Sequence, residues 1–197
     1  MRTIKLLLGC IIITALSCGM ASADLTDVPL VWKADNNALF SDSTTITGLL
    51  THKIKLALFS DSRPNKQEIG KNIEKAEVRT VTTKDNVAAW CTERMKDILR
   101  QYGMSVVEND ATVVIKTELI NFYVTESNLY EAIVTLRVAA SDPNGKVLWQ
   151  GQISAQSKRF GRSYKLENYQ ESLSYAFVDA VKTLLNNQEF NAAMLKK

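Results

Sequence analysis

The chain has 197 residues, of which 46% are hydrophobic and 23% are charged, and its formal net charge is +3. This length and composition are typical of a globular protein with one sizeable core. Without Arg2 and Lys5 the rest of the chain is close to neutral. A nucleic-acid partner is therefore not expected, because such domains normally carry a strongly basic face.

Residues 1–23 have the pattern of a signal peptide. Two basic residues precede the apolar run Leu6–Leu16, which is too short for a transmembrane helix of about 20 residues. Ala21-Ser22-Ala23 follows as a small-residue cleavage site. We therefore expect export to the periplasm, with cleavage after Ala23 as one outcome.

Lipid attachment at Cys18 is the other outcome, and the two stay open at this point. Ala15-Leu16-Ser17-Cys18-Gly19 resembles a bacterial lipobox, although Leu16 stands two residues before the cysteine rather than the usual three. An acylated Cys18 would anchor the protein to a membrane, with the outer membrane as the expected location. Cys91 then remains as a lone thiol on the apolar face of a predicted helix, where a buried small hydrophobe is expected.

The chain before the first helix is predicted to be mostly extended. Residues 24–45 show no clear hydrophobic period, and we interpret them as an extended arm or tether. Lys53–Ser60 alternates Ile54, Leu56 and Leu58 with polar residues, which predicts a first core strand. Gln67–Thr80 is interpreted as short strand pieces or a structured loop.

A strong amphipathic helix is predicted over Thr83–Tyr102, with Thr82 or Thr83 as its cap and Gly103 as its end. Ala111–Val124 is predicted to be a strand. The clearest local pattern is Leu129–Ser157, where strict alternation on both sides of Asp142-Pro143-Asn144-Gly145 predicts a hairpin. Its inner face would include Tyr130, Val134, Leu136 and Trp149.

The predicted element order is β-α-β-β-β-α, because a second amphipathic helix is expected over Glu167–Asn187. This order favours an α+β two-layer sandwich, with a mixed sheet of about four strands and two helices packed on one face. We expect a single domain over residues 46–190 and a frayed tail over residues 191–197.

No catalytic or metal-binding residues and no cofactor are predicted. His52 is the one histidine, and it has no cysteine or histidine neighbour in the sequence, whereas a metal site needs several ligands. A hydrolase or transferase acting on envelope polymers remains the alternative. It would require a cleft lined by two carboxylates, or by Cys91 together with His52.

Two surfaces are predicted as candidates for binding. The helix-free face of the hairpin would show Glu131, Ile133, Thr135 and Arg137, and we interpret it as a docking face. The segment after the hairpin combines cations with aromatic residues and could bind an anionic glycan or lipid, or it could be a solvated loop. Its candidate binding residues are Lys158, Arg159, Phe160, Arg162 and Lys165.

Between Lys53 and Phe190 the chain resembles the YajG-type family of small bacterial envelope lipoproteins. The resemblance rests on Asp61-Ser62-Arg63-Pro64, on the helix end Ile98–Gly103, and on the layout of the strands and the final helix. It implies a lipid-anchored envelope protein with no established activity. The function we expect is a non-enzymatic accessory that binds or helps to assemble an envelope protein, glycan or lipid component. The oligomeric state stays open.

Overall fold

The structure is a computed structural model that describes residues 24–35, 48–161 and 163–195. The predicted signal peptide, with Cys18 and Ala23, and the candidate binding residue Arg162 lie outside the described residues. The helices are η1 (Leu49–Thr51, a 3-10 helix), α2 (Val87–Gln101), α3 (Leu166–Leu185) and α4 (Gln188–Leu195). The strands are β1 (Lys53–Leu56), β2 (Ser60–Asp61), β3 (Glu68–Asn72), β4 (Arg79–Thr82), β5 (Ser105–Val106), β6 (Val113–Glu126), β7 (Leu129–Ser141) and β8 (Val147–Phe160).

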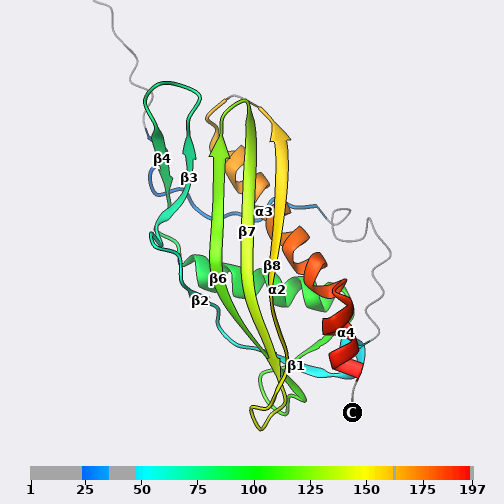
Figure 1. Ribbon diagram of the computed structural model, residues 1–197. Helices are drawn as coiled ribbons and strands as arrows, with labels where there is room; N and C mark the ends of the chain where they lie inside the picture. Colours follow the sequence, from blue (N-terminus) through cyan, green and yellow to red (C-terminus); the bar gives the residue numbers. More distant parts are fainter. Residues whose placement is uncertain (1–23, 36–47, 162, 196–197) are drawn as a thin grey trace, which may run out of the picture.

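Strand β6 organises the sheet (Figure 1). One of its edges pairs with antiparallel β7 along almost its whole length. The other edge pairs in succession with β1, β2 and β3, all of them parallel to it. The parallel pairing of β1 with β6 confirms the expected crossover through a helix.

The described residues form one eight-stranded mixed sheet, so the prediction of about four strands is wrong. Two of the additional strands, β3 and β4, lie in or at the end of Gln67–Thr80, which was interpreted as short strand pieces or a structured loop. The strands that the prediction lacked, β2 and β5, have two residues each. A run of two residues cannot show a two-residue period. The α+β class is confirmed.

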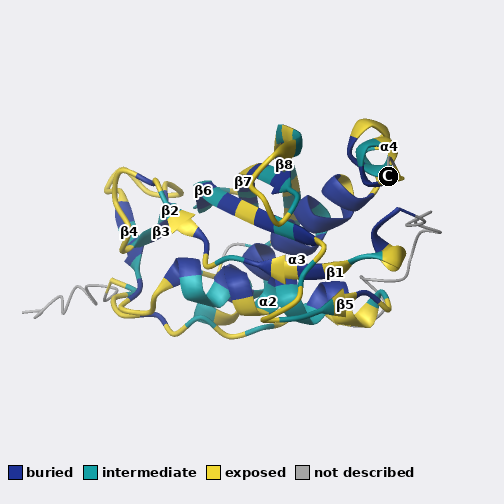
Figure 2. Ribbon diagram, turned by 90° about the horizontal axis from the view of Figure 1, so that it is seen from below, coloured by how far each residue is buried: buried dark blue, intermediate teal, exposed yellow. Residues whose placement is uncertain are grey.

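Helices α2 and α3 lie on one face of the sheet, behind it in Figure 1, and the end-on view in Figure 2 shows both on the same side. The side chains of β7 alternate accordingly. Tyr130, Val134 and Leu136 are fully buried against the helices, whereas Arg137 is exposed on the other face. At the hairpin turn Gly145 has a φ of 88°, which confirms the predicted turn chemistry.

A β-bulge in β6 changes which residues face the helices. The register with β7 shifts between Leu119 and Asn121, so Ile120 is the extra residue. Odd-numbered residues such as Leu119 are buried before the bulge, and even-numbered ones such as Phe122 are buried after it. Two glutamates of this strand, Glu118 and Glu126, therefore lie on opposite faces.

Residues 24–35 pack on the domain as an extended arm rather than a free tether, and residues 36–45 of the predicted arm or tether lie outside the described residues. Leu25 forms a parallel bridge with Val81 of β4, and Val28 is buried. The Leu30 carbonyl accepts a hydrogen bond from the Trp90 indole at 3.0 Å, and the Lys33 amide donates to the Ser174 hydroxyl at 3.0 Å. The segment thus crosses β4, α2 and α3.

The C-terminal tail is also packed, and its prediction as frayed is wrong as far as Leu195. Helix α4 buries Phe190 and Met194, and the Phe190 ring meets the Trp149 indole with centroids 5.0 Å apart. Two local predictions are also wrong. The cap of α2 is Asn86 and not Thr82 or Thr83. Leu58, which was expected in the first core strand, is 67% exposed because that strand is interrupted between β1 and β2.

Candidate functional site: the helix-free face of the sheet

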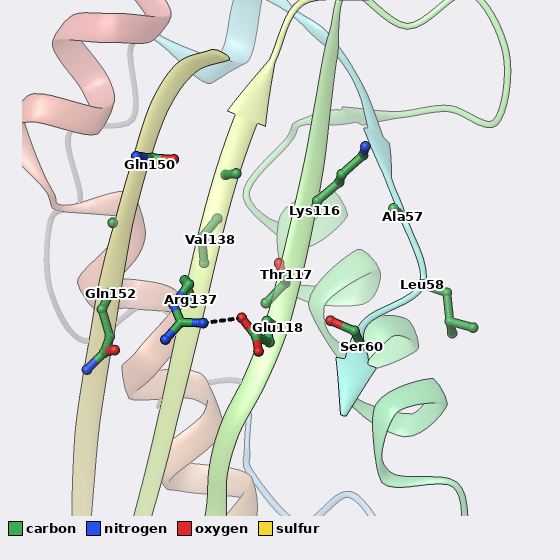
Figure 3. Close-up of a pocket in the computed structure, with 12 residues that line it drawn as sticks. Ala57, Leu58, Ser60, Lys116, Thr117, Glu118, Arg137, Val138, Gln150 and Gln152 are labelled. Carbon is green, nitrogen blue, oxygen red and sulfur yellow. Dashed lines mark hydrogen bonds and ion pairs between the residues drawn. The ribbon is translucent and has the colours of Figure 1, made fainter. Parts of the chain in front are cut away.

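The helix-free face contains a hollow of about 660 Å³ that spans β6, β7 and β8 and the chain between β1 and β2 (Figure 3). Ala57 and Ala139 contribute small side chains to it, and Leu58 stands exposed at its rim. The polar residues that line the hollow are Ser60, Lys116, Thr117, Glu118, Arg137, Gln150 and Gln152. It is a shallow, open site whose lining combines these polar groups with apolar ones.

Cross-strand register places four of these residues in one row. Ser60 of β2 pairs with Glu118 of β6, which pairs with Arg137 of β7, which pairs with Gln152 of β8. Arg137 donates a hydrogen bond to Glu118 and forms an ion pair with it, as Figure 3 shows. The row fixes polar groups at the strand spacing of about 4.8 Å.

Glu118 is held as a carboxylate by two donors. The Ser62 hydroxyl bonds one carboxylate oxygen and Arg137 bonds the other. The hydrogen bond from Ser62, together with that from Arg137, holds the pKa of Glu118 below its ordinary value of 4.5. The hollow therefore presents a fixed, ionised pair rather than a free acid.

The predicted docking residues lie on this face along β7. Thr135 is 8% exposed, and its hydroxyl lies 2.9 Å from that of Ser154 on β8. Glu131 forms an ion pair with Lys158 at 2.9 Å. Ile133 is half-buried. Among the four, Arg137 reaches the hollow itself.

The predicted binding segment after the hairpin is not one loop. Lys158, Arg159 and Phe160 are the last residues of β8, and Lys165 stands at the N-cap position of α3 without a side-chain capping bond. Their side chains alternate, so Lys158 joins Glu131 across the hairpin, whereas Arg159 forms an ion pair with Glu171 of α3. The structure therefore separates these cations instead of clustering them.

The sequence analysis missed the lining residues from β8, although a signal was present. Gln150, Gln152, Ser154 and Gln156 alternate with Gly151, Ile153 and Ala155, which indicates a strand with one polar, uncharged face. Gly151 lies under the Trp149 indole, and a Cβ there would approach the ring to 2.5 Å. This contact cannot be inferred from the sequence alone.

A buried polar cluster lies on the opposite, helix-covered face. The Glu126 carboxylate accepts from the Tyr169 hydroxyl at 2.7 Å and from the Tyr164 amide at 2.8 Å. The Arg79 guanidinium stacks 3.7 Å from the centroid of the Tyr164 ring. Tyr164 has a φ of 42°, which is unusual for a residue other than glycine. This cluster fastens the start of α3 to the end of β6.

His52 and Cys91, one of the two residue sets named for the enzymatic alternative, are engaged in structural contacts. His52 Nε2 bonds the Met194 carbonyl at 2.8 Å and Nδ1 lies 3.0 Å from the Thr112 hydroxyl, so both ring nitrogens are occupied. Cys91 is fully buried, and burial raises the pKa of its thiol well above the ordinary value. Within residues 24–35, 48–161 and 163–195, no three acidic, cysteine or histidine side chains are grouped to hold a metal.

Fold and site together define an α+β domain in which, among the described residues, helices cover one face of the sheet and leave the other open. The family model of uncharacterized lipoproteins, Lipoprotein_16, matches residues 50–195, and the chain belongs to this family. Membership indicates an exported, envelope-associated protein. None of the helices in the described residues is long and apolar enough to cross a membrane. The search among curated proteins returned no match.

Solved structures show a similar fold. A Xanthomonas campestris protein superposes with a TM-score of 0.54 at 11% identity, over 68% of this chain and 82% of that one. A putative lipoprotein from Caulobacter crescentus gives a TM-score of 0.46 at 11% identity, over 65% and 92% of the two chains. For PelC from Paraburkholderia phytofirmans, a dodecamer, the values are 0.43, 13%, 68% and 86%.

Proposed function

We propose that this chain is a non-enzymatic lipoprotein, anchored through Cys18 and facing the periplasm, that binds another envelope protein on its helix-free face. The hollow at Glu118 and Arg137 is the observation that carries this proposal. It lies on the face opposite to α2 and α3, and Figure 2 shows these two helices together on the other side of the sheet. A YajG-type role as an envelope accessory, which the sequence resemblance implies, fits the same assignment.

The chemistry of the face favours an extended protein segment as the ligand. Gln150 and Gln152 offer amide donors and acceptors, and Lys116 adds a cation. Such groups match the peptide groups and side chains of a partner strand. Arg137 is paired with Glu118 and Lys158 with Glu131, so the described part of this face offers few unpaired cations to an anionic polymer.

Photo-crosslinking in intact cells tests the proposal. A photoreactive phenylalanine analogue at Gln152 should give one discrete crosslinked envelope protein. The same analogue at Arg100, exposed on α2 on the helix-covered side, is the matched control and should give none. Equal products at both positions, or none at Gln152, would remove the docking face.

A second variant links the crosslink to the hollow. Ala139→Trp places a large side chain in the hollow without changing the buried face of β7. It should abolish the crosslink from Gln152 while leaving the thermal unfolding midpoint close to that of the wild type. An unchanged crosslink would show that the partner does not occupy the hollow.

The intact mass of the mature protein, purified from membranes, tests whether Cys18 carries the lipid anchor. Its intact mass should correspond to a chain that begins at a lipid-modified Cys18. A mass that begins at Asp24 would contradict anchoring and leave the docking face to be decided by the crosslinks.

A further inference from the structure

The N-terminal segment is fastened at one end of the sheet. Leu25 pairs in parallel with Val81, so the chain before it approaches from the start of β4, which is the side of the β3–β4 turn. The Leu25 amide also donates to the Tyr164 hydroxyl at 2.9 Å. These bonds fix Asp24 relative to the sheet.

The same end exposes large apolar side chains. Ile73 and Val78 flank the β3–β4 turn and are 41% and 58% exposed. Phe160, the last residue of β8, is 82% exposed, which is the highest value among the exposed large hydrophobic residues of the described chain. Figure 1 shows the β3–β4 turn and the end of β8 at one end of the molecule.

The short stretch of chain between Cys18 and Asp24 determines which end of the sheet can lie near the membrane. Leu50, Val147 and Leu195 are also exposed, and Val147 begins β8, whereas Phe160 ends it. Cys18 and Asp24 are six residues apart, a span of at most about 20 Å when fully extended. Strand β8, with 14 residues, is about 45 Å long. A lipid on Cys18 thus holds the bilayer near the β3–β4 end.

We propose that this end rests on the bilayer that holds the anchor, with Ile73, Val78 and Phe160 inserted into the interface between headgroups and acyl chains. The proposal depends on the lipid attachment at Cys18 given above. Apolar side chains of a surface-bound protein enter the bilayer by about 5–10 Å. The sheet then stands away from the membrane, and its helix-free face stays open to the periplasm.

Lipid-quenching fluorescence tests this orientation on the anchored protein. Phe160→Cys and Val147→Cys introduce thiols at the two ends of one strand, and Cys91 is too buried to compete for the label. Each variant carries an environment-sensitive dye. It is reconstituted into vesicles of phosphatidylethanolamine and phosphatidylglycerol in equal parts, with or without doxyl-labelled lipid.

We expect quenching at Phe160→Cys to be several-fold stronger than at Val147→Cys, and Val78→Cys to behave like Phe160→Cys. Introducing Ile73→Ser and Val78→Ser together should lower the quenching at Phe160→Cys. Equal quenching at Phe160→Cys and Val147→Cys would indicate that the domain lies flat on the bilayer. Dyes that remain exposed to water at Phe160→Cys and Val78→Cys would indicate that this end of the sheet does not touch the bilayer. Either result overturns the proposal, as does a mature protein without lipid, whereas the crosslinks from Gln152 decide the docking face separately.

Discussion

Two glutamates on strand β6 lie in opposite environments. Glu118 faces the helix-free side and is bonded by Ser62 and Arg137 near solvent. Glu126 faces the helices, is fully buried and is bonded by Tyr169 and the Tyr164 amide. Eight positions apart on a regular strand, the two would share a face. The bulge at Ile120 separates them.

The difference between the two sites lies in what each carboxylate does for the fold. Glu126 satisfies donors that have no access to water, so its loss leaves them unpaired inside the core. Glu118 satisfies groups that water can reach, so its loss costs the fold little. Glu118 contributes little to the stability of the fold, and this agrees with the docking face proposed on its side of the sheet.

Deleting Ile120 should have the largest effect. Without the extra residue, the segment from Asn121 to Glu126 must turn over or lose its register with β3 and β7. Phe122 and Val124, both fully buried now, would then face water. We expect insoluble protein or a chain with no cooperative urea transition. A soluble deletion variant with a wild-type transition would show that the bulge does not define the two faces.

Replacing Glu126 should have the next largest effect. Glu126→Ala leaves the Tyr169 hydroxyl and the Tyr164 amide without their acceptor, and we expect a loss of about 3 kcal/mol in the free energy of unfolding. Urea denaturation at neutral pH measures it. Glu118→Ala is the matched control on the same strand and should leave the midpoint unchanged. Equal losses in both variants would contradict the comparison.

Gly70→Ala should disturb the buried side more mildly. A Cβ at Gly70 would come within 2.8 Å of the Val124 carbonyl oxygen and 3.0 Å of the Tyr169 ring. Overpacking of this kind costs about 1–3 kcal/mol, and it pushes on the donor that bonds Glu126. The control is Gly145→Ala, where no atom would meet the Cβ and any cost comes from its φ of 88°. Urea midpoints compare the two, and a Gly70→Ala variant as stable as the wild type would contradict the close packing.

The parts of the fold that sequence reasoning predicts are those where the evidence is local. The hairpin of β7 and β8 was predicted because its alternation is long and its turn residues stand together. The stripe of α2 was predicted for the same reason. Strands β2 and β5 were missed because two residues carry no period. Their pairing depends on β6 and β1, which are distant in the sequence.

The packed ends and the hollow depend on contacts between distant segments. Residues 24–35 show no period, yet Lys33 bonds Ser174, 141 positions away. Phe190 is held by Trp149 on another element. The docking face was predicted from the alternation of β7 alone. The hollow itself requires the register of β2, β6, β7 and β8, which no single stretch of sequence contains.

The smallest effect concerns the titration of Glu118. The bond from Ser62, followed by that from Arg137, lowers its pKa below 4.5, so carbon NMR should record a midpoint below that value. Ser62→Ala should move it back towards 4.5, and so should Arg137→Ala. Because the folded pKa is lowered, the stability that this group contributes is complete above pH 4.5 and is lost as the pH falls through the folded pKa. The side chain is near solvent, so the urea midpoint at neutral pH should barely change in either variant. If Ser62→Ala left the NMR titration midpoint of Glu118 unchanged, hydrogen bonds would not hold the row on the helix-free face together. The hollow would then lack the fixed polar pattern on which the proposed docking depends.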